Sequence, residues 1–238
     1  MSAALPPDEV HVWQWPLDPL PAEVEACWAL LTAEEQSQAA AISQVERRRH
    51  YLYVRGSLRA LLGRYTASAA AQLPLRRSER GKPFLAAPFS HLTFTLTHSG
   101  SWLWIALAQA CAVGIDLERL RPAPPEQRVR LACRFFHPHE CAALSALSSS
   151  AVHEAFLACW VRKEACIKCW GGSIAQDCHR FAVSVDPEQP ATLLQRPALL
   201  HHPLHVLDLP APTGYRAALA WQGAAPPQVR HFSAAILV

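Results

Sequence analysis

The sequence predicts a mixed α/β fold made of two similar halves, each with a small sheet packed on one long helix. One long segment in each half, residues 32–64 and 152–170, has the helical spacing of apolar residues. Short β-like runs follow both segments, which is the arrangement expected when helices cover a sheet. Hydrophobic residues make up 51% of the 238-residue chain and charged residues 17%, so the chain can bury a substantial core.

The two halves also resemble each other locally. The run 54–63 is similar to 161–171 in the helical segments, and 99–108 is similar to 213–220 in the later strands. Each member of a pair occupies the same place in its half, with the helix first and the strand last. A ligand cleft is expected between two such halves. The predicted halves are residues 1–115 and 116–238.

The first half is predicted to open with a strand over residues 10–15, where side-chain character alternates. Its helical segment starts at Thr32, which forms a capping-box pattern with Glu35 three residues later. Arginines decorate the later part of that segment: Arg47, Arg48, Arg49, Arg55 and Arg59. After a turn at 81–83, the predicted strands are 92–97, 102–108 and 112–118, with a turn at 98–100.

In the second half, a proline-rich linker precedes a short helix that ends at residue 136. Residues 145–151 are small and mostly polar, and we expect a loop there. The long helix over 152–170 stops at two consecutive glycines, Gly171 and Gly172. The remaining predicted strands are 181–185, 204–209 and 215–221.

Charge and apolar runs exclude some classes of partner. The formal net charge is +3 and the sequence pI is near 8.5, which is too mild to indicate nucleic acid but would not repel an acidic protein. The longest apolar stretch, residues 102–115, is interrupted by Gln109 and Gly114 and is too short to span a membrane as a helix. The N-terminal residues lack the pattern of a secretory signal. We therefore expect a cytoplasmic protein without a membrane partner.

The chain has eight cysteines, which raises the question of a zinc site or a disulfide framework. Cys166 and Cys169 have CxxC spacing, and Cys178 and His179 follow, but the flanking pattern is helical and the second pair lacks zinc-finger spacing. We therefore do not expect a metal at these cysteines. The others are expected to be small buried side chains: Cys27, Cys111, Cys133, Cys141 and Cys159.

Two short stretches carry most of the chemical information. After an apolar run and Gly114, the carboxylates of Asp116 and Glu118 stand two residues apart, so a strand would direct both to one face. Glu164 and Lys168 stand four residues apart in the long helix, so they share one helix face. Three carboxylates and a lysine that converge on one cleft suit Mg²⁺ and a phosphate ester. This combination predicts an enzyme of phosphoryl chemistry.

Each of these residues also has a simpler interpretation. Asp116 and Glu118 could be solvent-facing residues at a strand end, and Glu164 with Lys168 could be a surface pair worth a few tenths of a kcal/mol. Their positions favour function, because the first pair follows a buried strand and the second lies among apolar residues.

Two further features suit an anion. Lys82 lies between Gly81 and Pro83 on a stiff turn, although such turns are also common surface loops. His98 follows the hydroxyl residue Thr97 at a strand end, where a lone histidine is often structural. Both lie in the same half as the arginine-rich helical segment, which favours an anion site.

Taken together, these motifs resemble those of the 4′-phosphopantetheinyl transferases, in particular the larger, surfactin-synthetase-activating type. The similar segments occur in the family's order: Gly81–Pro83, Phe94–Gly100, Gly114–Glu118, Arg134–Phe136 with Glu140, and Trp160–Lys168. The resemblance implies two pseudo-symmetric α/β halves with coenzyme A in the cleft between them. It also implies an Mg²⁺-dependent reaction, in which 4′-phosphopantetheine moves from coenzyme A to a serine of an acyl- or peptidyl-carrier protein and adenosine 3′,5′-bisphosphate is released.

The resemblance assigns roles at the reacting phosphate. Asp116, Glu118 and Glu164 would be the metal ligands and hold Mg²⁺ against the pyrophosphate. Glu164 would take the proton from the serine, and Lys168 would offset negative charge on the transferred phosphoryl group. Asp116, Glu164 and Lys168 would therefore be catalytic and would also contact coenzyme A.

The resemblance also implies contacts with the nucleotide. His98, beside the hydroxyl of Thr97, would bind the 3′-phosphate of coenzyme A. Lys82 and the backbone around Gly81 and Pro83 would line the nucleotide pocket. A basic residue of the first half would help at the 3′-phosphate, and the candidates stay open: Arg47, Arg48, Arg49, His50 and Arg55.

Two alternatives to the transferase remain at this point. The chain could be a catalytically silent module that binds coenzyme A or a nucleotide, or a different Mg²⁺-dependent phosphohydrolase. The natural carrier stays open among those of fatty acid, polyketide and nonribosomal peptide synthesis. Two fused halves would make a monomer sufficient.

Overall fold

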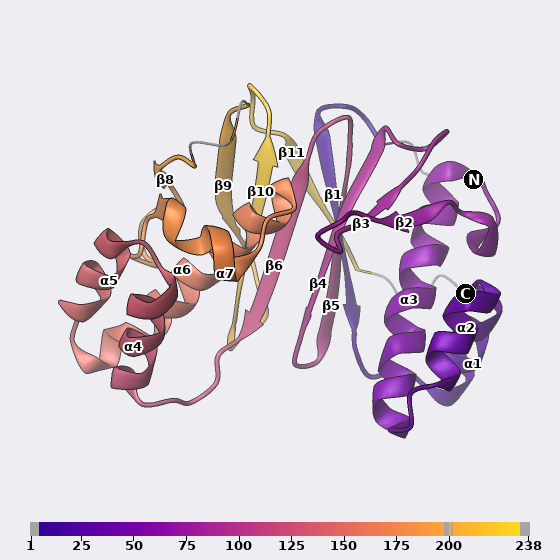
Figure 1. The fold of residues 1–238 in the computed structure, drawn as a ribbon, viewed down its shortest axis with the longest axis horizontal. Coiled ribbons are helices and arrows are strands. Elements are labelled where there is room, and N and C mark those ends of the chain that lie inside the picture. The colour runs from indigo at the N-terminus through magenta and orange to yellow at the C-terminus, as the bar shows by residue number, and fades with distance from the viewer. Residues whose placement is uncertain (1–4, 198–199, 201, 234–238) are drawn as a thin grey trace.

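The computed structural model describes residues 5–197, 200 and 202–233. Figure 1 shows strands in the middle of the molecule, with the first three helices on one side and the later helices on the other. The helices are α1 (Pro21–Ala29), α2 (Ala33–Ala40), α3 (Val45–Thr66), α4 (Pro125–Phe135), α5 (Pro138–Ser145), α6 (Ser149–Trp170) and α7 (Ile174–Asp177). None of these helices is both long and apolar enough to cross a membrane.

Two larger sheets and two small ones are formed. The first large sheet has the order β11–β1–β5–β4 and the second the order β6–β10–β9, while β2 pairs with β3 and β7 with β8. The strands of the first half are β1 (Glu9–Pro16), β2 (Leu75–Arg77), β3 (Pro83–Leu85), β4 (Leu92–Ser99) and β5 (Trp102–Gln109). The later strands are β6 (Val113–Arg119), β7 (Ala182–Val183), β8 (Leu193–Gln195), β9 (Leu204–Leu209), β10 (Tyr215–Gln222) and β11 (Gln228–Ser233).

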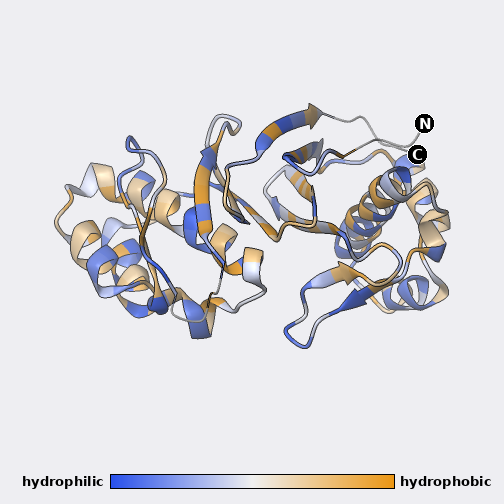
Figure 2. Cartoon of the chain, turned by 90° about the horizontal axis from the view of Figure 1, so that it is seen from above, coloured by the Kyte–Doolittle hydropathy of each residue, from blue (hydrophilic) through white to orange (hydrophobic). Residues whose placement is uncertain are grey.

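The two large sheets pack face to face, because their strands are apolar on both sides. On β5, Leu103, Ile105 and Leu107 belong to the core cluster shared with α3, whereas Trp104 and Ala106 belong to the cluster shared with the second sheet. This alternation follows from the two-residue period of a strand. Figure 2 shows hydrophobic stretches in the central strands and mixed hydrophilic and hydrophobic residues along the outer helices. The prediction of a mixed α/β fold is confirmed.

The second sheet packs on α6 through a close approach at Gly114 of β6. A Cβ at this position would overlap the carbonyl oxygen of Ala165 and the amide nitrogen of Cys169 in α6. Only glycine leaves the space for this approach. The side chains of Asp116 and Glu118 alternate with buried Ile115 and Leu117, so they lie on the α6 side of the strand.

Strands β4 and β6 lie side by side in different sheets, and hydroxyl side chains link them (Figure 1). Thr97 Oγ1 accepts a hydrogen bond from the backbone N–H of Leu117 at 3.3 Å. Ser99 Oγ accepts one from the N–H of Arg119 at 3.0 Å. The junction between the halves is therefore built from side chains of β4.

The predicted division at residues 115 and 116 stays a proposal, and the topology departs from it in two ways. The boundary falls inside β6, which begins at Val113. The last described strand, β11, lies in the first sheet, where it pairs in parallel with β1 from Glu9↔Gln228 to Gln14↔Ser233. The sequence contains no local signal for this long-range pairing.

The predicted helical segment over residues 32–64 is divided into α2 and α3. Thr32 caps α2 as expected, with Thr32 Oγ1 accepting from the N–H of Glu35 at 3.2 Å. The helix ends at Ala40, and α3 starts at Val45. The predicted loop at 145–151 was too long, because α5 extends to Ser145 and α6 begins at Ser149.

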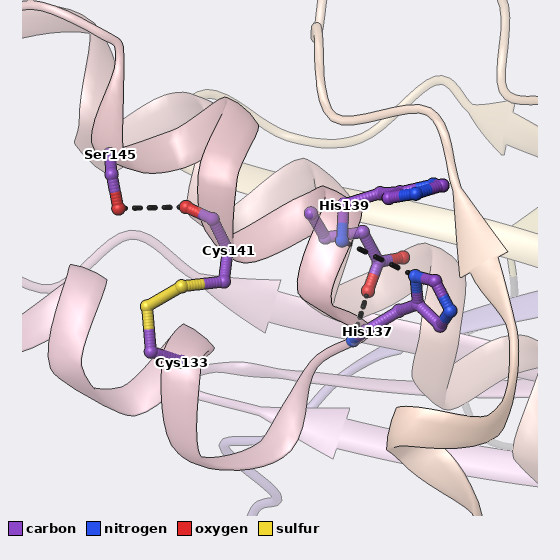
Figure 3. Close-up of a disulfide and its surroundings, with 6 residues drawn as sticks. Cys133, His137, His139, Cys141 and Ser145 are labelled. Carbon is purple, nitrogen blue, oxygen red and sulfur yellow. Dashed lines mark hydrogen bonds between the residues drawn. A yellow bond between two sulfur atoms is a disulfide. The ribbon is translucent and has the colours of Figure 1, made fainter.

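The expectation for two of the cysteines was wrong. Cys133 of α4 and Cys141 of α5 form a disulfide with a Cα–Cα distance of 4.9 Å (Figure 3). Cys133 is exposed and Cys141 is half-buried, so neither is a buried thiol. The turn between two short helices brings them together, and spacing alone does not reveal such a contact.

The other cysteines fit the expectation more closely. The free thiols of Cys27 and Cys159 are buried, and that of Cys111 is half-buried. Cys166, Cys169 and Cys178 are also free and buried. Within the described residues, no group of three His, Cys, Asp or Glu side chains is placed to hold a metal.

Candidate active site

Asp116 of β6 is the most buried carboxylate of the predicted site, with 2% of its surface exposed. Its Oδ1 accepts hydrogen bonds from Lys168 Nζ at 2.6 Å and from Thr97 Oγ1 at 3.0 Å. Its Oδ2 is buried without a hydrogen-bond partner. A buried carboxylate oxygen without a donor is costly, so this atom is suited to a ligand that arrives later.

Glu118, two residues further along β6, faces the same side as Asp116. Its Oε2 accepts a hydrogen bond of 2.7 Å from Ser99 Oγ of β4. Burial raises the pKa of the Glu118 carboxyl, and the nearby charge of Asp116 adds to this, against the opposing hydrogen bond from Ser99. The sequence-based prediction did not include Ser99, although it lies two residues after Thr97 and therefore on the same face of β4.

Glu164 and Lys168 reach the two acids from α6, which Gly114 allows to approach. Burial raises the pKa of Glu164 to about 7, and the charges of Asp116 and Glu118 act in the same direction. Burial would lower the pKa of Lys168, but Asp116 and Glu164 outweigh it and the pKa is raised. The structure thus brings together the four side chains that the two sequence motifs predicted, with Lys168 as a cation and Glu164 near half-ionisation at neutral pH.

The donor set of the three acids fits Mg²⁺. All available atoms are carboxylate oxygens, and Asp116 Oδ2 has no protein partner. Within the described part of the chain the acids do not form a closed three-ligand cluster. Mg²⁺ does not require one, because it is usually held by one or two carboxylates together with substrate phosphates and water.

A cavity of about 880 Å³ lies beside this group, between the two halves. Lys168, His98 and Gly171 line one end of it. Its other basic side chains come from α3 and from the hairpin of β2 and β3, namely Arg47, His50, Arg55, Arg77, Arg80 and Lys82. Its apolar lining includes Ile42, Val54, Phe94 and Leu96. A basic cavity with apolar walls is suited to a ligand with phosphates and an organic body.

His98 and His50 meet within the cavity, with ring centroids 4.7 Å apart in an edge-on arrangement. Burial lowers the pKa of His50. Burial also lowers the pKa of His98, as do the neighbouring His50 and Lys168. Both rings are therefore predominantly neutral at neutral pH, and an anion between them would favour their protonation. His50 Nε2 is buried without a hydrogen-bond partner.

The structure separates the candidate basic residues of the first half into those that line the cavity and those that do not. Arg47, His50 and Arg55 line the cavity. Arg48 instead donates to the carbonyl oxygen of Ile42, with Nε at 2.9 Å and Nη2 at 2.8 Å. Arg49 lies outside the cavity, where Nη2 donates to the carbonyl oxygen of Pro19 at 3.1 Å. The structure therefore does not bring the predicted Arg49 to the other site residues.

Arg55 is held by a buried carboxylate. Its Nε lies 2.9 Å from Glu35 Oε1, an ion pair without hydrogen-bond geometry, and Glu35 Oε2 lies 2.5 Å from Nε of Arg59. Glu35 is therefore shared by two arginines of α3. This pair fixes Arg55 at the cavity wall and leaves part of its guanidinium for a ligand.

The predicted turn at Gly81–Pro83 lies at the cavity, and Gly81 has a φ of 83°, a conformation that favours glycine. Lys82 lines the cavity with its stem, but its ammonium points to α6. Nζ donates to the carbonyl oxygens of Lys168 at 2.6 Å and Cys169 at 2.8 Å. Burial lowers the pKa of Lys82.

Lys163, beside Glu164 in the sequence, points away from the cavity. It is 1% exposed, and its Nζ lies 2.7 Å from Oε2 of the equally buried Glu140. Nζ also donates to the carbonyl oxygen of Phe181 at 2.6 Å. This part of the sequence motif connects α5, α6 and the start of β7, and removing either partner would leave the other charge buried and uncompensated.

Comparison with known proteins identifies the family. A model described as the 4′-phosphopantetheinyl transferase superfamily matches residues 112–220, and one described as 4′-phosphopantetheinyl transferase, N-terminal, matches residues 13–110. The 4′-phosphopantetheinyl transferase HetI of a Nostoc species is 35% identical over 193 residues, which cover 80% of this chain and 80% of that protein. The chain belongs to the 4′-phosphopantetheinyl transferase superfamily.

Another relative agrees with this assignment, and one solved structure resembles part of the chain weakly. A 4′-phosphopantetheinyl transferase of Bacillus subtilis is 30% identical over 171 residues, 65% of this transferase and 71% of that protein. A holo-(acyl-carrier-protein) synthase from Bacillus anthracis, solved in complex with CoA (3′,5′-ADP), covers 48% of the transferase and 96% of its own chain, with a TM-score of 0.39 at 17% identity. That likeness is too slight to support an argument. The resemblance found in the motifs and the prediction that the chain is an enzyme of this class are confirmed.

Proposed function

We propose that this transferase moves 4′-phosphopantetheine from coenzyme A to a serine of an acyl- or peptidyl-carrier protein and releases adenosine 3′,5′-bisphosphate. The observation that carries this proposal is the contact of Lys168 with Asp116 at the end of a basic cavity of about 880 Å³. Through this contact, Lys168 links the cavity between the two halves to the cluster of Asp116, Glu118 and Glu164. Family membership supplies the reaction type, and the cluster supplies groups that fit it.

Glu164 is the proposed base for the serine hydroxyl. Its pKa of about 7 means that a substantial fraction is ionised at neutral pH, while its basicity exceeds that of an ordinary carboxylate. Glu164 lies on α6 one turn before Lys168, so the base and the cation share one helix face. Lys168 would stabilise the negative charge that develops on the phosphoryl oxygens and on the leaving group.

Asp116, Glu118 and Glu164 are the proposed ligands of Mg²⁺. When bound, the ion would neutralise charge on the diphosphate and polarise the phosphorus that is attacked. Asp116 Oδ2 is the first candidate ligand atom, because it is buried and has no protein donor. Thr97 and Lys168 would keep the Asp116 carboxylate oriented through its other oxygen.

The cavity is the proposed site of the nucleotide part of coenzyme A. His98 would bind the 3′-phosphate, together with Arg47, His50 or Arg55 of α3. Gly81, Lys82 and Pro83 would line the nucleotide pocket as predicted. Arg49 is not included, because it lies outside this cavity.

The proposed docking surface for the carrier lies on the other side of Glu164. A depression of about 260 Å³ there is lined by residues that include Glu118, Arg119, Arg121, Arg128, Leu131 and Trp160. Trp160 stands one helical turn before Glu164, and Lys168 stands one turn after it, so the base lies between this depression and the cavity. A basic and apolar surface suits an acidic carrier protein.

The remaining parts of the proposal concern the setting. The mild net charge of +3 does not favour nucleic acid, and we propose coenzyme A and carrier proteins as the only classes of partner. We propose a monomeric state, because both halves of the cleft come from one chain. A cytoplasmic location completes the proposal. The pathway stays open among fatty acid, polyketide and nonribosomal peptide synthesis.

The test is incubation of the protein with coenzyme A, Mg²⁺ and a panel of apo carrier proteins, followed by intact-mass spectrometry. We expect one carrier to gain the mass of one phosphopantetheine group. Tight binding of coenzyme A without this gain would favour a silent binding module. Consumption of coenzyme A without a carrier would favour a phosphohydrolase.

A further inference from the structure

The ammonium of Lys82 is directed at the ends of two elements that carry the site. It donates hydrogen bonds to the carbonyl oxygens of Lys168 and Cys169 in the last turn of α6, at 2.6 and 2.8 Å. It also lies 3.4 Å from the carbonyl oxygen of Val113, the first residue of β6. An ammonium has three protons, so these three carbonyl oxygens use its donors.

The carbonyls at the end of α6 need such a donor. The last four carbonyl groups of a helix have no partner within it. That of Ile167 accepts from the N–H groups of Gly171 and Gly172, which close the helix. Those of Lys168 and Cys169 accept from Lys82 instead, and a cation at this end is also favoured by the helix dipole.

The two elements that Lys82 contacts are β6, which carries the acid Asp116, and α6, which carries the cation Lys168. The side chain of Lys168 donates to Asp116, while the backbone carbonyl of the same residue accepts from Lys82. Asp116 lies three residues after Val113 on β6. The Lys82 ammonium, which comes from the first half, therefore contacts the backbone of both elements that form the Asp116–Lys168 ion pair.

The hairpin that carries Lys82 is itself attached to the second half. Arg80 Nη1 lies 3.4 Å from Oδ2 of buried Asp177 in α7. Within the hairpin, the N–H of Ser78 donates to the carbonyl oxygen of Lys82 at 2.9 Å. Gly171 packs beside the Lys82 stem, since a Cβ at this position would stand 3.4 Å from Lys82 Cδ, within ordinary van der Waals contact. Contacts within the hairpin and with the second half thus hold Lys82 in place.

We propose that Lys82 is a positioning residue, which fixes the last turn of α6 and thereby holds Lys168 against Asp116, rather than a residue that binds a phosphate of the nucleotide through its ammonium. This inference rests on the proposed transfer reaction and deepens it. It assigns Lys82 to the chemical step, with a smaller part in the affinity for coenzyme A.

The test combines Lys82→Met with Lys168→Met in a double-mutant cycle. Methionine keeps the length of the stem and removes the donors. Alone, Lys82→Met should lower kcat by roughly tenfold to a hundredfold and change the Kd for coenzyme A less than threefold. In the Lys168→Met background it should cause little further loss of kcat, because it acts through Lys168. Lys82→Arg, which can still donate to carbonyls, should recover part of the activity.

Arg76→Met is the matched control, because Arg76 lies in the same hairpin, is exposed and does not line the cavity. It should leave kcat and Kd unchanged. An equal loss of kcat from Lys82→Met in both backgrounds, or a large rise in Kd with kcat unchanged, would overturn the inference. If Lys82→Met does not fold, Lys82→Arg in the two backgrounds replaces it: its smaller loss of kcat should disappear in the Lys168→Met background, and an equal loss in both would overturn the inference.

The two levels of proposal fail in different ways. If the unmodified protein transfers nothing to any carrier, the proposed function fails and the inference fails with it. If the unmodified protein is active and Lys82→Met has the same kcat, only the inference about Lys82 fails.

Discussion

Lys168 Nζ donates a hydrogen bond of 2.6 Å to Oδ1 of Asp116, which places a cation from α6 on an acid from β6. Asp116 is almost fully buried, whereas Lys168 keeps 30% of its side chain exposed at the cavity. The ion pair therefore faces a ligand from one side only. Glu164, one turn earlier on α6, stands beside two acids, and burial together with their charges raises its pKa to about 7.

Glu164→Gln should change how stability depends on pH. The folded-state pKa of Glu164 is about 7, above the ordinary 4.5, so the folded protein binds this proton more tightly than the unfolded chain does. This stabilisation is fully present below pH 4.5 and is lost as the pH rises through 7. A shift of this size corresponds to about 3 kcal/mol, which solvent screening of the half-buried carboxyl reduces to about 1–2 kcal/mol.

Urea unfolding from pH 5 to pH 8, with a chelator present to remove divalent cations, measures this effect. Glu164→Gln should gain stability relative to the unmodified protein as the pH rises. The same difference at pH 5 and pH 8 would mean that the carboxyl titrates normally. In the transfer assay with Mg²⁺, the variant should lose most of its activity.

His98→Ala should weaken the binding of coenzyme A much more than that of 3′-dephospho-coenzyme A. The reason is that the 3′-phosphate is the proposed partner of His98, which meets His50 in the cavity. We expect roughly tenfold weaker binding of coenzyme A and less than a twofold change for the dephospho form, a difference of about 1 kcal/mol. Titration calorimetry with both ligands checks this, and equal weakening of the two would remove His98 from the 3′-phosphate.

Thr97→Val should destabilise the junction between the sheets. The variant removes the donor to Asp116 Oδ1 and the acceptor for the N–H of Leu117, both of them buried. Leaving a buried N–H without a partner costs about 1–3 kcal/mol. Chemical denaturation measures the loss, and Thr97→Ser, which retains the hydroxyl, should restore most of it. A serine variant as unstable as the valine variant would mean that the hydroxyl's hydrogen bonds do not account for the loss.

Arg121→Glu should raise KM for the carrier protein. Arg121 is exposed at the depression beside Glu118, where the proposed acidic partner docks. A reversed charge should raise KM for the carrier roughly tenfold while kcat and the Kd for coenzyme A change little. The effect should shrink at high salt, because exposed charges are screened. Arg130→Glu on α4, exposed but outside this depression, is the control, and an equal effect from both would indicate only net charge.

Reduction of the Cys133–Cys141 disulfide should lower stability. The two cysteines are separated by eight residues, and closing a loop of this length is worth about 2–3 kcal/mol in the chain-entropy model. Unfolding with and without a dithiol measures the loss, and mass spectrometry after alkylation confirms which thiols are free. The double variant Cys133→Ser, Cys141→Ser should be insensitive to the dithiol, whereas a continued response would implicate other cysteines.

The sequence predicts the elements around the site better than their connections. Asp116, Glu118, Glu164 and Lys168 could be predicted because strand and helix periods decide which side chains share a face. Gly114 was recognised as part of the motif, but its packing role against α6 requires the third dimension. The pairing of β11 with β1 could not be predicted, because it depends on contacts more than 200 residues apart.

For the basic residues, the sequence does not predict which side chains reach the cavity. A cluster such as Arg47, Arg48, Arg49, His50 and Arg55 lies on one helix, and the rotation of α3 against the sheet decides which of them reach the cavity. The separation of Arg49 from Arg47 follows from the packing of α1 against α3, to which no motif points. The direction of the Lys82 ammonium likewise depends on where α6 ends, and α6 is far away in the sequence.

The parallel pairing of β11 with β1 has a practical consequence for anyone who shortens the chain. Deleting residues from Gln228 onward would remove β11, the strand that covers one edge of β1 in the first sheet. The amide groups of β1 that now pair with β11 would then face water and offer a template for self-association. Truncated forms should precipitate or oligomerise even with every catalytic side chain intact.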